Sequence, residues 1–168
     1  MSNLVHDLGI ATLLRSLQNL DTIVSKAEEY VAADKNLEPE TLIQARLYPN
    51  MGPFIFQVRV ATDTAKGAAA RLAGKPVPSW PDTETTFADV HERLRKAKDY
   101  LSGFAPSDFD GAENRAIELK LGPETKNFTG SSYLSTFVLP NFFFHVTTAY
   151  NILRHNGLVI GKRDFLGG

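Results

Sequence analysis

Apolar residues recur at alternating steps of three and four positions along residues 3–33, and this spacing predicts one long amphipathic helix. Its buried face would consist of Ile10, Leu13, Leu17, Leu20, Val24, Ala27 and Val31. Residues 34–40 contain Asn36 and Pro39 and are predicted to form a loop. Residues 41–47 are predicted to add one or two helical turns.

A second helix is predicted to begin near Gly52-Pro53, because proline is tolerated in a first turn, and to end near Ala73, with Gly74 as its C-cap. Its face is rich in alanine and carries one amide: Phe54, Gln57, Val58, Ala61, Ala65, Ala68 and Leu72. Residues 75–82 hold three prolines and the only tryptophan, and predict an ordered connection. A third helix is expected over residues 86–102, with a buried stripe of Phe87, Val90, Leu94, Ala97 and Leu101.

Residues 104–130 interrupt the helical pattern. Ile117, Leu119 and Leu121 alternate with polar residues before the turn at residues 122–124, which predicts a small β-hairpin. A fourth helix is expected over residues 132–156, with Pro140 either kinking it or marking its true start. The tail is expected to pack back through Leu158, Ile160 and Phe165.

The pattern predicts an all-α four-helix bundle with the hairpin inserted between its third and fourth helices. Residues 1–168 are expected to form a single domain. The connection containing the hairpin is long enough to allow a non-trivial topology.

The amino-acid composition excludes several kinds of functional site. The 168 residues include no cysteine and four histidines, and the formal net charge is −1. Zero cysteine excludes disulfides, thiolate nucleophiles, iron–sulfur clusters and Cys-type zinc sites. The near-zero charge and the lack of a basic stripe favour neither nucleic acid nor membrane as a partner. No targeting segment or apolar run of about 18 residues is visible, so we expect a cytoplasmic protein.

The candidate chemistry lies on the fourth helix. Asn141 and His145 are spaced i, i+4 and share a face that points to the core, and Gln57 on the second helix is their expected partner. Buried polar side chains need hydrogen-bond partners. This amide–amide–imidazole cluster is either an unusual metal site, the polar floor of a ligand pocket, or a hydrogen-bond network that fixes helix register.

The other three histidines and the charged residues of the second helix are not expected to form a functional site. His6 is expected to be partly exposed at the first helix, His91 to be solvated, and His155 to interact with the dipole at the end of the fourth helix. Arg59, Asp63 and Lys66 are expected to form a solvated charged face of the second helix. The acidic residues Asp108, Asp110 and Glu113 do not complete an EF-hand, and no P-loop, dinucleotide loop, HExxH or GxSxG motif occurs.

Three segments resemble an uncharacterised bacterial family related to the DinB/YfiT-like proteins: residues 45–74, residues 140–157 and the tail at residues 161–167. The resemblance implies a DinB-like four-helix bundle, often homodimeric. Many members of that superfamily bind a divalent metal through three histidines, and some are metal-dependent thiol transferases or isomerases. His145 would match the second histidine of the fourth-helix pair, Asn141 the first, and Gln57 the histidine of the second helix.

This chain therefore keeps one of the three histidines. Amide oxygens are weak ligands for zinc or nickel beside a single imidazole, so we expect no cofactor. The first hypothesis is a small-ligand-binding or non-catalytic homodimeric bundle with a degenerate metal site. The alternatives are a divalent-metal-dependent transferase or hydrolase using zinc, nickel or manganese, and metal-free acid–base chemistry with His145 oriented by Asn141. The run Phe142-Phe143-Phe144 also favours a dimer, because three consecutive phenylalanines cannot all face one core.

Overall fold

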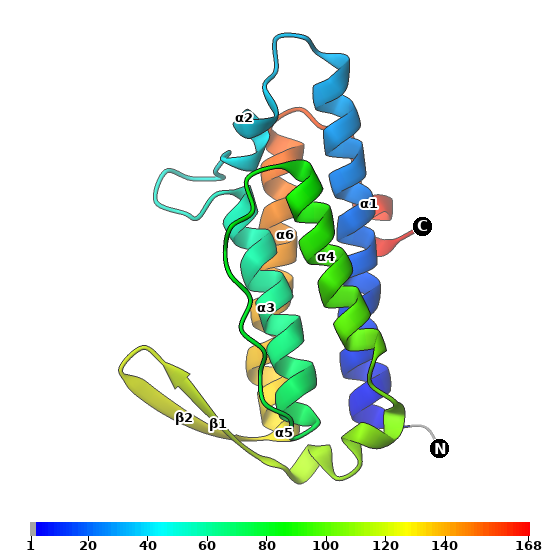
Figure 1. Ribbon diagram of the computed structural model, residues 1–168, viewed down its shortest axis with the longest axis vertical. Coiled ribbons are helices and arrows are strands. Elements are labelled where there is room, and N and C mark those ends of the chain that lie inside the picture. Colours follow the sequence, from blue (N-terminus) through cyan, green and yellow to red (C-terminus); the bar gives the residue numbers. More distant parts are fainter. Residues whose placement is uncertain (1–2) are drawn as a thin grey trace.

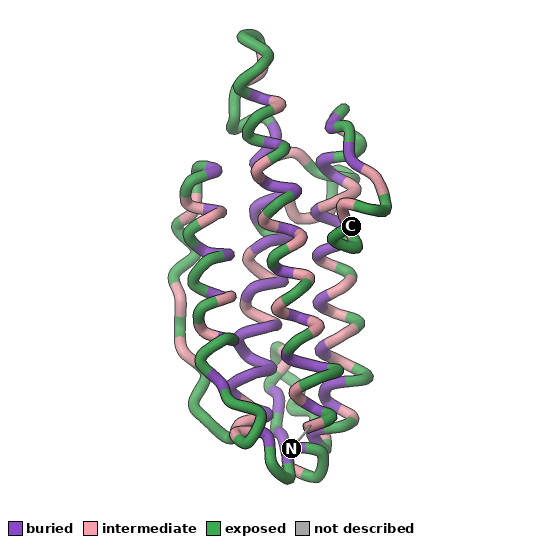
Figure 2. Tube along the Cα trace, turned by 90° about the vertical axis from the view of Figure 1, so that its right-hand side faces the viewer, coloured by how far each residue is buried: buried purple, intermediate pink, exposed green. Residues whose placement is uncertain are grey.

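Helix α1 (Ala11–Ala33) continues from a π-helical turn, η1 (His6–Ile10), and buries the whole predicted apolar face. The computed structural model describes residues 3–168, so the first two residues of the predicted domain lie outside the described part. The loop that follows ends two residues earlier than predicted, because Pro39 opens the short helix α2 (Pro39–Ile43), and α2 in turn ends before residues 44–47, which were predicted to be helical. Figure 1 shows α1 extending beyond the other helices, and Figure 2 shows its far end exposed.

Helix α3 (Phe54–Leu72) lies against α6 (Leu139–His155), and α4 (Phe87–Ser102) packs against both α1 and α3. The predicted stripes of α3 and α4 are buried, and Gly74, at φ +67°, follows α3 as predicted. Thr86 caps α4 by accepting a hydrogen bond from the Asp89 N–H, and Asp89 bonds back to the Thr86 N–H. The predicted helical bundle with an inserted hairpin is confirmed (Figure 1).

The connection containing the hairpin is long enough to allow a non-trivial topology, but the long crossover of the bundle is the proline-rich segment before α4. Figure 1 shows this segment running back along α3, so that α3 and α4 are parallel. Lys75, just after α3, accordingly pairs with Asp108, just after α4. Residues 75–86 suffice, because an extended chain of that length reaches about 40 Å and α3 is about 28 Å long.

The connection from α4 to α6 closes the end of the bundle where α1 begins. Two 3-10 turns, η2 (Pro106–Phe109) and η3 (Ala112–Asn114), precede strands β1 (Ala116–Leu121) and β2 (Glu124–Thr129). The strands are antiparallel, with Ala116 opposite Thr129 and Leu121 opposite Glu124. A Cβ on Gly130 would lie 1.8 Å from the Ala112 carbonyl oxygen, so only glycine permits this close approach of η3 to the next helix.

Pro140 marks a change of helix type. The chain runs from α5 (Gly130–Ser132) through a π-helical segment, η4 (Tyr133–Val138), directly into α6. Proline has no N–H to donate, and the wider π turn, in which the Leu139 N–H bonds to the Leu134 carbonyl, accommodates it. The tail ends in α7 (Lys162–Leu166), which lies on α1, and Leu158 and Ile160 are buried as predicted.

The expectation of a solvated charged face on α3 is wrong. Lys66 is only 5% exposed and pairs with Asp63 at 2.6 Å, and its Nζ lies 4.5 Å from the Trp80 ring centre. Arg59 pairs with Glu84 at 2.8 Å. The crossover thus covers these charges, which the sequence pattern placed in solvent. Within residues 3–168, no helix is long and apolar enough to cross a membrane.

Candidate functional site

His145 and Gln57 meet between α6 and α3. His145 Nδ1 lies 2.7 Å from Gln57 Oε1, and Gln57 Nε2 donates a hydrogen bond to the Gly52 carbonyl oxygen at 2.8 Å. The Gly52 carbonyl can only accept, so it fixes the amide with Oε1 toward the imidazole. His145 Nδ1 must then carry the proton, which leaves the lone pair on Nε2. No hydrogen bond to Nε2 occurs within residues 3–168.

The environment keeps this imidazole neutral. His145 is half-buried, and this burial lowers its pKa below the ordinary value. The rings of Phe56 and Phe144 flank it edge to face, with centres 6.1 Å and 5.2 Å away. These two phenylalanines are 45% and 56% exposed, so the imidazole lies between apolar walls that reach solvent. The site therefore offers a neutral hydrogen-bond acceptor beside aromatic surface.

Asn141 lies one helical turn before His145, but its Nδ2 donates to Thr64 Oγ1 on α3 at 2.8 Å. The residue that orients His145 is therefore Gln57, whereas the acid–base hypothesis assigned that role to Asn141. The cluster is two separate α3–α6 contacts, and both join the helices that the sequence predicted would meet.

The fit of a metal can be tested on this geometry. A metal on His145 would take Nε2, whereas Gln57 Oε1 is engaged on the opposite nitrogen in the manner of an outer-shell orienting group. As arranged, Gln57 and His145 do not present lone pairs to one point, so the three side chains do not fit a three-ligand site. No group of three or more His, Cys, Asp or Glu residues within residues 3–168 is arranged to hold a metal ion.

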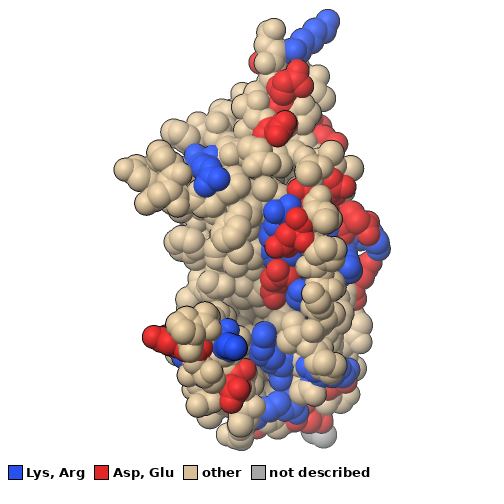
Figure 3. All heavy atoms as spheres, turned by 60° about the vertical axis from the view of Figure 1, so that its left-hand side comes forward, with Lys and Arg blue, Asp and Glu red and all other residues tan. Residues whose placement is uncertain are grey.

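The stretch of chain that carries His145 lacks charge. Residues 127–153 contain no Asp, Glu, Lys or Arg, although Pro140, Phe144 and Thr147 are exposed on α6. In Figure 3 the surface between the loop before α3 and the hairpin is hollowed and largely free of charged side chains. The phenylalanine run divides as expected, since Phe142 is buried and Phe144 faces outward. The uncharged stretch was a sequence signal for this surface.

The remaining histidines lie elsewhere. His6 is partly exposed beside Asp7, and His155 lies exposed in the last turn of α6, both as predicted. The expectation that His91 is solvated is wrong: its Nδ1 lies 2.5 Å from Asp21 on α1, which also pairs with Lys98 at 2.6 Å. These contacts fasten α4 to α1.

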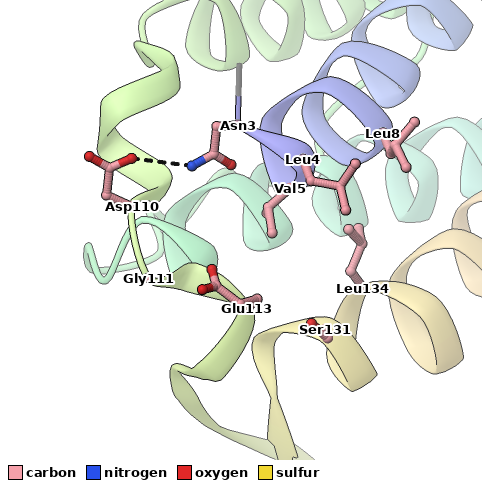
Figure 4. A pocket seen from close by; sticks show the side chains of 9 residues that line it. All are labelled: Asn3, Leu4, Val5, Leu8, Asp110, Gly111, Glu113, Ser131 and Leu134. Atoms are coloured by element: carbon pink, nitrogen blue, oxygen red, sulfur yellow. Dashed lines mark hydrogen bonds between the residues drawn. The ribbon is translucent and has the colours of Figure 1, made fainter. Parts of the chain in front are cut away.

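Sequence reasoning missed a cavity at the end of the bundle where α1 begins. It measures about 610 Å³ and is lined by Asn3, Leu4, Val5, Leu8, Asp110, Gly111, Glu113, Ser131 and Leu134 (Figure 4). The sequence signal for it is the pair of acidic residues Asp110 and Glu113 in a loop, whose spacing does not complete an EF-hand. The lining comes from three segments far apart in the chain, which no local motif could bring together.

Comparison with known proteins places the chain among uncharacterised relatives. The model of a domain of unknown function, DUF1993, matches residues 5–166. The chain is also similar to a DinB family member protein from Shewanella denitrificans, whose crystal structure was determined at 1.83 Å resolution. The identity is 37%, the match covers 98% of this chain and 93% of that one, and the TM-score is 0.89. No curated protein matches the chain.

Proposed function

Since the chain belongs to the DUF1993 family and has a DinB-like fold, we propose that it is a cytoplasmic, non-catalytic homodimer that binds a small ligand at His145. The observation that carries the proposal is the His145 Nε2 lone pair, which is left unpaired within residues 3–168 by the hydrogen bonds from His145 to Gln57 and from Gln57 to Gly52. Nε2 lies beside two aromatic rings, so a ligand that donates a hydrogen bond to it can also bury apolar surface against them and gain affinity from both contacts.

The chemistry around the acceptor defines the ligand. The imidazole is neutral at physiological pH because burial lowers its pKa, and the neighbouring stretch of chain carries no charge. Phe56 and Phe144 supply aromatic walls. A neutral, planar molecule with an O–H or N–H donor matches this combination.

The homodimer is part of the same proposal. It is supported by the exposed Phe144 and by the outer surface of α6 before Arg154, which carries no charge and can approach its own copy without like-charge repulsion. A second copy there would shield the ligand site from solvent.

Phenol is a suitable probe of this site, followed through the ring nitrogens of His145 by NMR. We expect the free protein to have the neutral Nδ1–H tautomer, and phenol to shift the Nε2 resonance in a saturable manner. Anisole, which lacks the donor, should bind more weakly. Phe144→Ala should weaken phenol binding roughly two- to ten-fold, the range of an aromatic contact. His145→Gln should abolish the phenol-induced shifts of the backbone amides near Phe56 and Phe144, whereas His155→Gln, on the exposed end of α6, should retain them.

The alternative is a divalent-metal-dependent transferase or hydrolase of the DinB/YfiT type, which the same Nε2 lone pair favours. Elemental analysis of untagged protein loaded with zinc, nickel or manganese separates the two. One tightly held metal per chain that is lost in His145→Ala would overturn the metal-free proposal. An Nε2 resonance that does not respond to phenol would also contradict it.

A further inference from the structure

The cavity at the end of the bundle is separate from the site around His145. Its 610 Å³ lies within the range of about 300–1,000 Å³ that is typical of small-molecule sites. The floor is formed by Val5 and Leu134, which are 7% and 8% exposed. Leu4 and Leu8, one helical turn apart, are 72% and 59% exposed. Two large leucines that reach solvent on one side of a cavity provide an exposed apolar wall.

The opposite side carries negative charge. Asp110 directly follows η2 and Glu113 lies in η3, both in the connection from α4 to β1, and no Lys or Arg lines the cavity. Within residues 3–168 neither carboxylate forms an ion pair. Asp110 accepts a hydrogen bond from Asn3 Nδ2 at 3.3 Å, and Glu113 accepts one from Asn114 Nδ2 at 3.4 Å. Both bonds come from neutral amides, so the two charges are not neutralised.

Figure 4 shows the two kinds of side chain on different sides, with the carboxylates on the loop and the leucines on the helices. We propose that this cavity binds a small amphipathic cation, with an ammonium group at Asp110 and Glu113 and an apolar tail against Leu4, Leu8 and Leu134. A carboxylate-bearing molecule would be repelled by two like charges. A neutral apolar molecule would fill only the leucine side.

The chemistry can be tested with n-butyl-, n-hexyl- and n-octylammonium chloride, titrated into the full-length protein and followed by backbone NMR. We expect saturable shifts at residues 3–8, 110–113 and 131–134. Affinity should rise by up to about fourfold for each added CH₂, the equivalent of about 0.8 kcal/mol per buried methylene. Octanol should bind more weakly than octylammonium, and octanoate should not bind. Added salt should weaken only the ammonium series, because salt screens charge.

Variants separate the two halves of the cavity. Asp110→Asn and Glu113→Gln should each weaken octylammonium binding roughly two- to five-fold, the effect of one exposed ion pair, and leave octanol binding unchanged. Leu8→Ala should weaken both ligands. Leu166→Ala, which removes a leucine that is 53% exposed on α7, is the matched control and should weaken neither.

Two results would overturn the proposal. One is octylammonium and octanol binding with equal affinity, unaffected by the two charge variants, because the cavity would then select only apolar character. The other is the absence of saturable shifts around the cavity. His145→Gln should leave octylammonium binding unchanged, so failure here and failure of the proposed site at His145 are distinguishable.

Discussion

The contact between Gln57 and His145 illustrates how far single residues could be read from the sequence. Spacing placed both on core-facing stripes and predicted that they would meet, and Nδ1 of His145 is bonded to Gln57. Spacing could not show that Gly52 fixes the amide or that Asn141 bonds to Thr64 instead. Those details depend on how α3 is rotated against α6, which packing of the whole core decides.

The lowered pKa of His145 makes the free energy of unfolding depend on pH. Burial lowers its folded-state pKa below the ordinary value of 6.5, so the unfolded chain takes up a proton first as the pH falls. The free energy of unfolding should therefore decrease below about pH 6.5, and His145→Gln should lack this part of the decrease. Guanidinium denaturation at pH 7.5, 6.5 and 5.5 measures it, with His155→Gln as control. Equal pH slopes for wild type and His145→Gln would contradict the prediction.

Among the elements, the crossover before α4 was the hardest to predict. Its prolines indicated an ordered connection, but nothing local could indicate that it runs back along α3. Arg93 holds it there: Nε donates to Thr62 at 2.8 Å and Nη1 to Glu84 at 2.6 Å, although the Arg93 side chain is only 2% exposed. Periodicity assigns arginine to the solvent side of a helix. The hydrophobic pattern therefore does not predict a buried arginine whose partners lie on other segments.

The contacts of Arg93 predict that replacing Arg93 and replacing Arg95, both on α4, have unequal effects on the free energy of unfolding. Burial of Glu84 opposes its ionisation, but hydrogen bonds from Arg93, its own backbone N–H and Arg59 outweigh burial and hold its pKa below the usual value. Arg93→Ala should lower the free energy of unfolding by about 3 kcal/mol, because it leaves buried acceptors and carboxylates short of a partner. Arg95→Ala, which removes exposed pairs with Glu92 and Asp99, should cost about 0.5 kcal/mol. Urea denaturation compares them, and equal losses would show that Arg93 does not clamp the crossover.

At the scale of the whole molecule, charge is distributed unevenly. Ion pairs join α1 to α4, and α3 to the crossover and α4, whereas residues 127–153 add no charged side chain to the surface of α6. Hydrophobic periodicity predicted the helices and their buried faces because burial dominates their pattern. Hydrophobic periodicity does not distinguish an exposed uncharged surface from a charged one, because serine, threonine and proline count as polar in the same way as charged residues. The uncharged stretch can be read from the sequence, but its position on the surface depends on how the helices assemble.

This asymmetry determines how the proposed dimer can be tested. Thr147 is exposed in the uncharged stretch, and two-fold symmetry would bring the same surface of both copies together. Thr147→Lys should therefore place like charges across the interface and convert a dimer to monomer at micromolar concentration in sedimentation velocity. Thr22→Lys, at an exposed position on α1, is the control and should remain dimeric. A monomeric wild-type protein would contradict the dimer itself, and a Thr147→Lys variant that remains dimeric would move the interface away from α6.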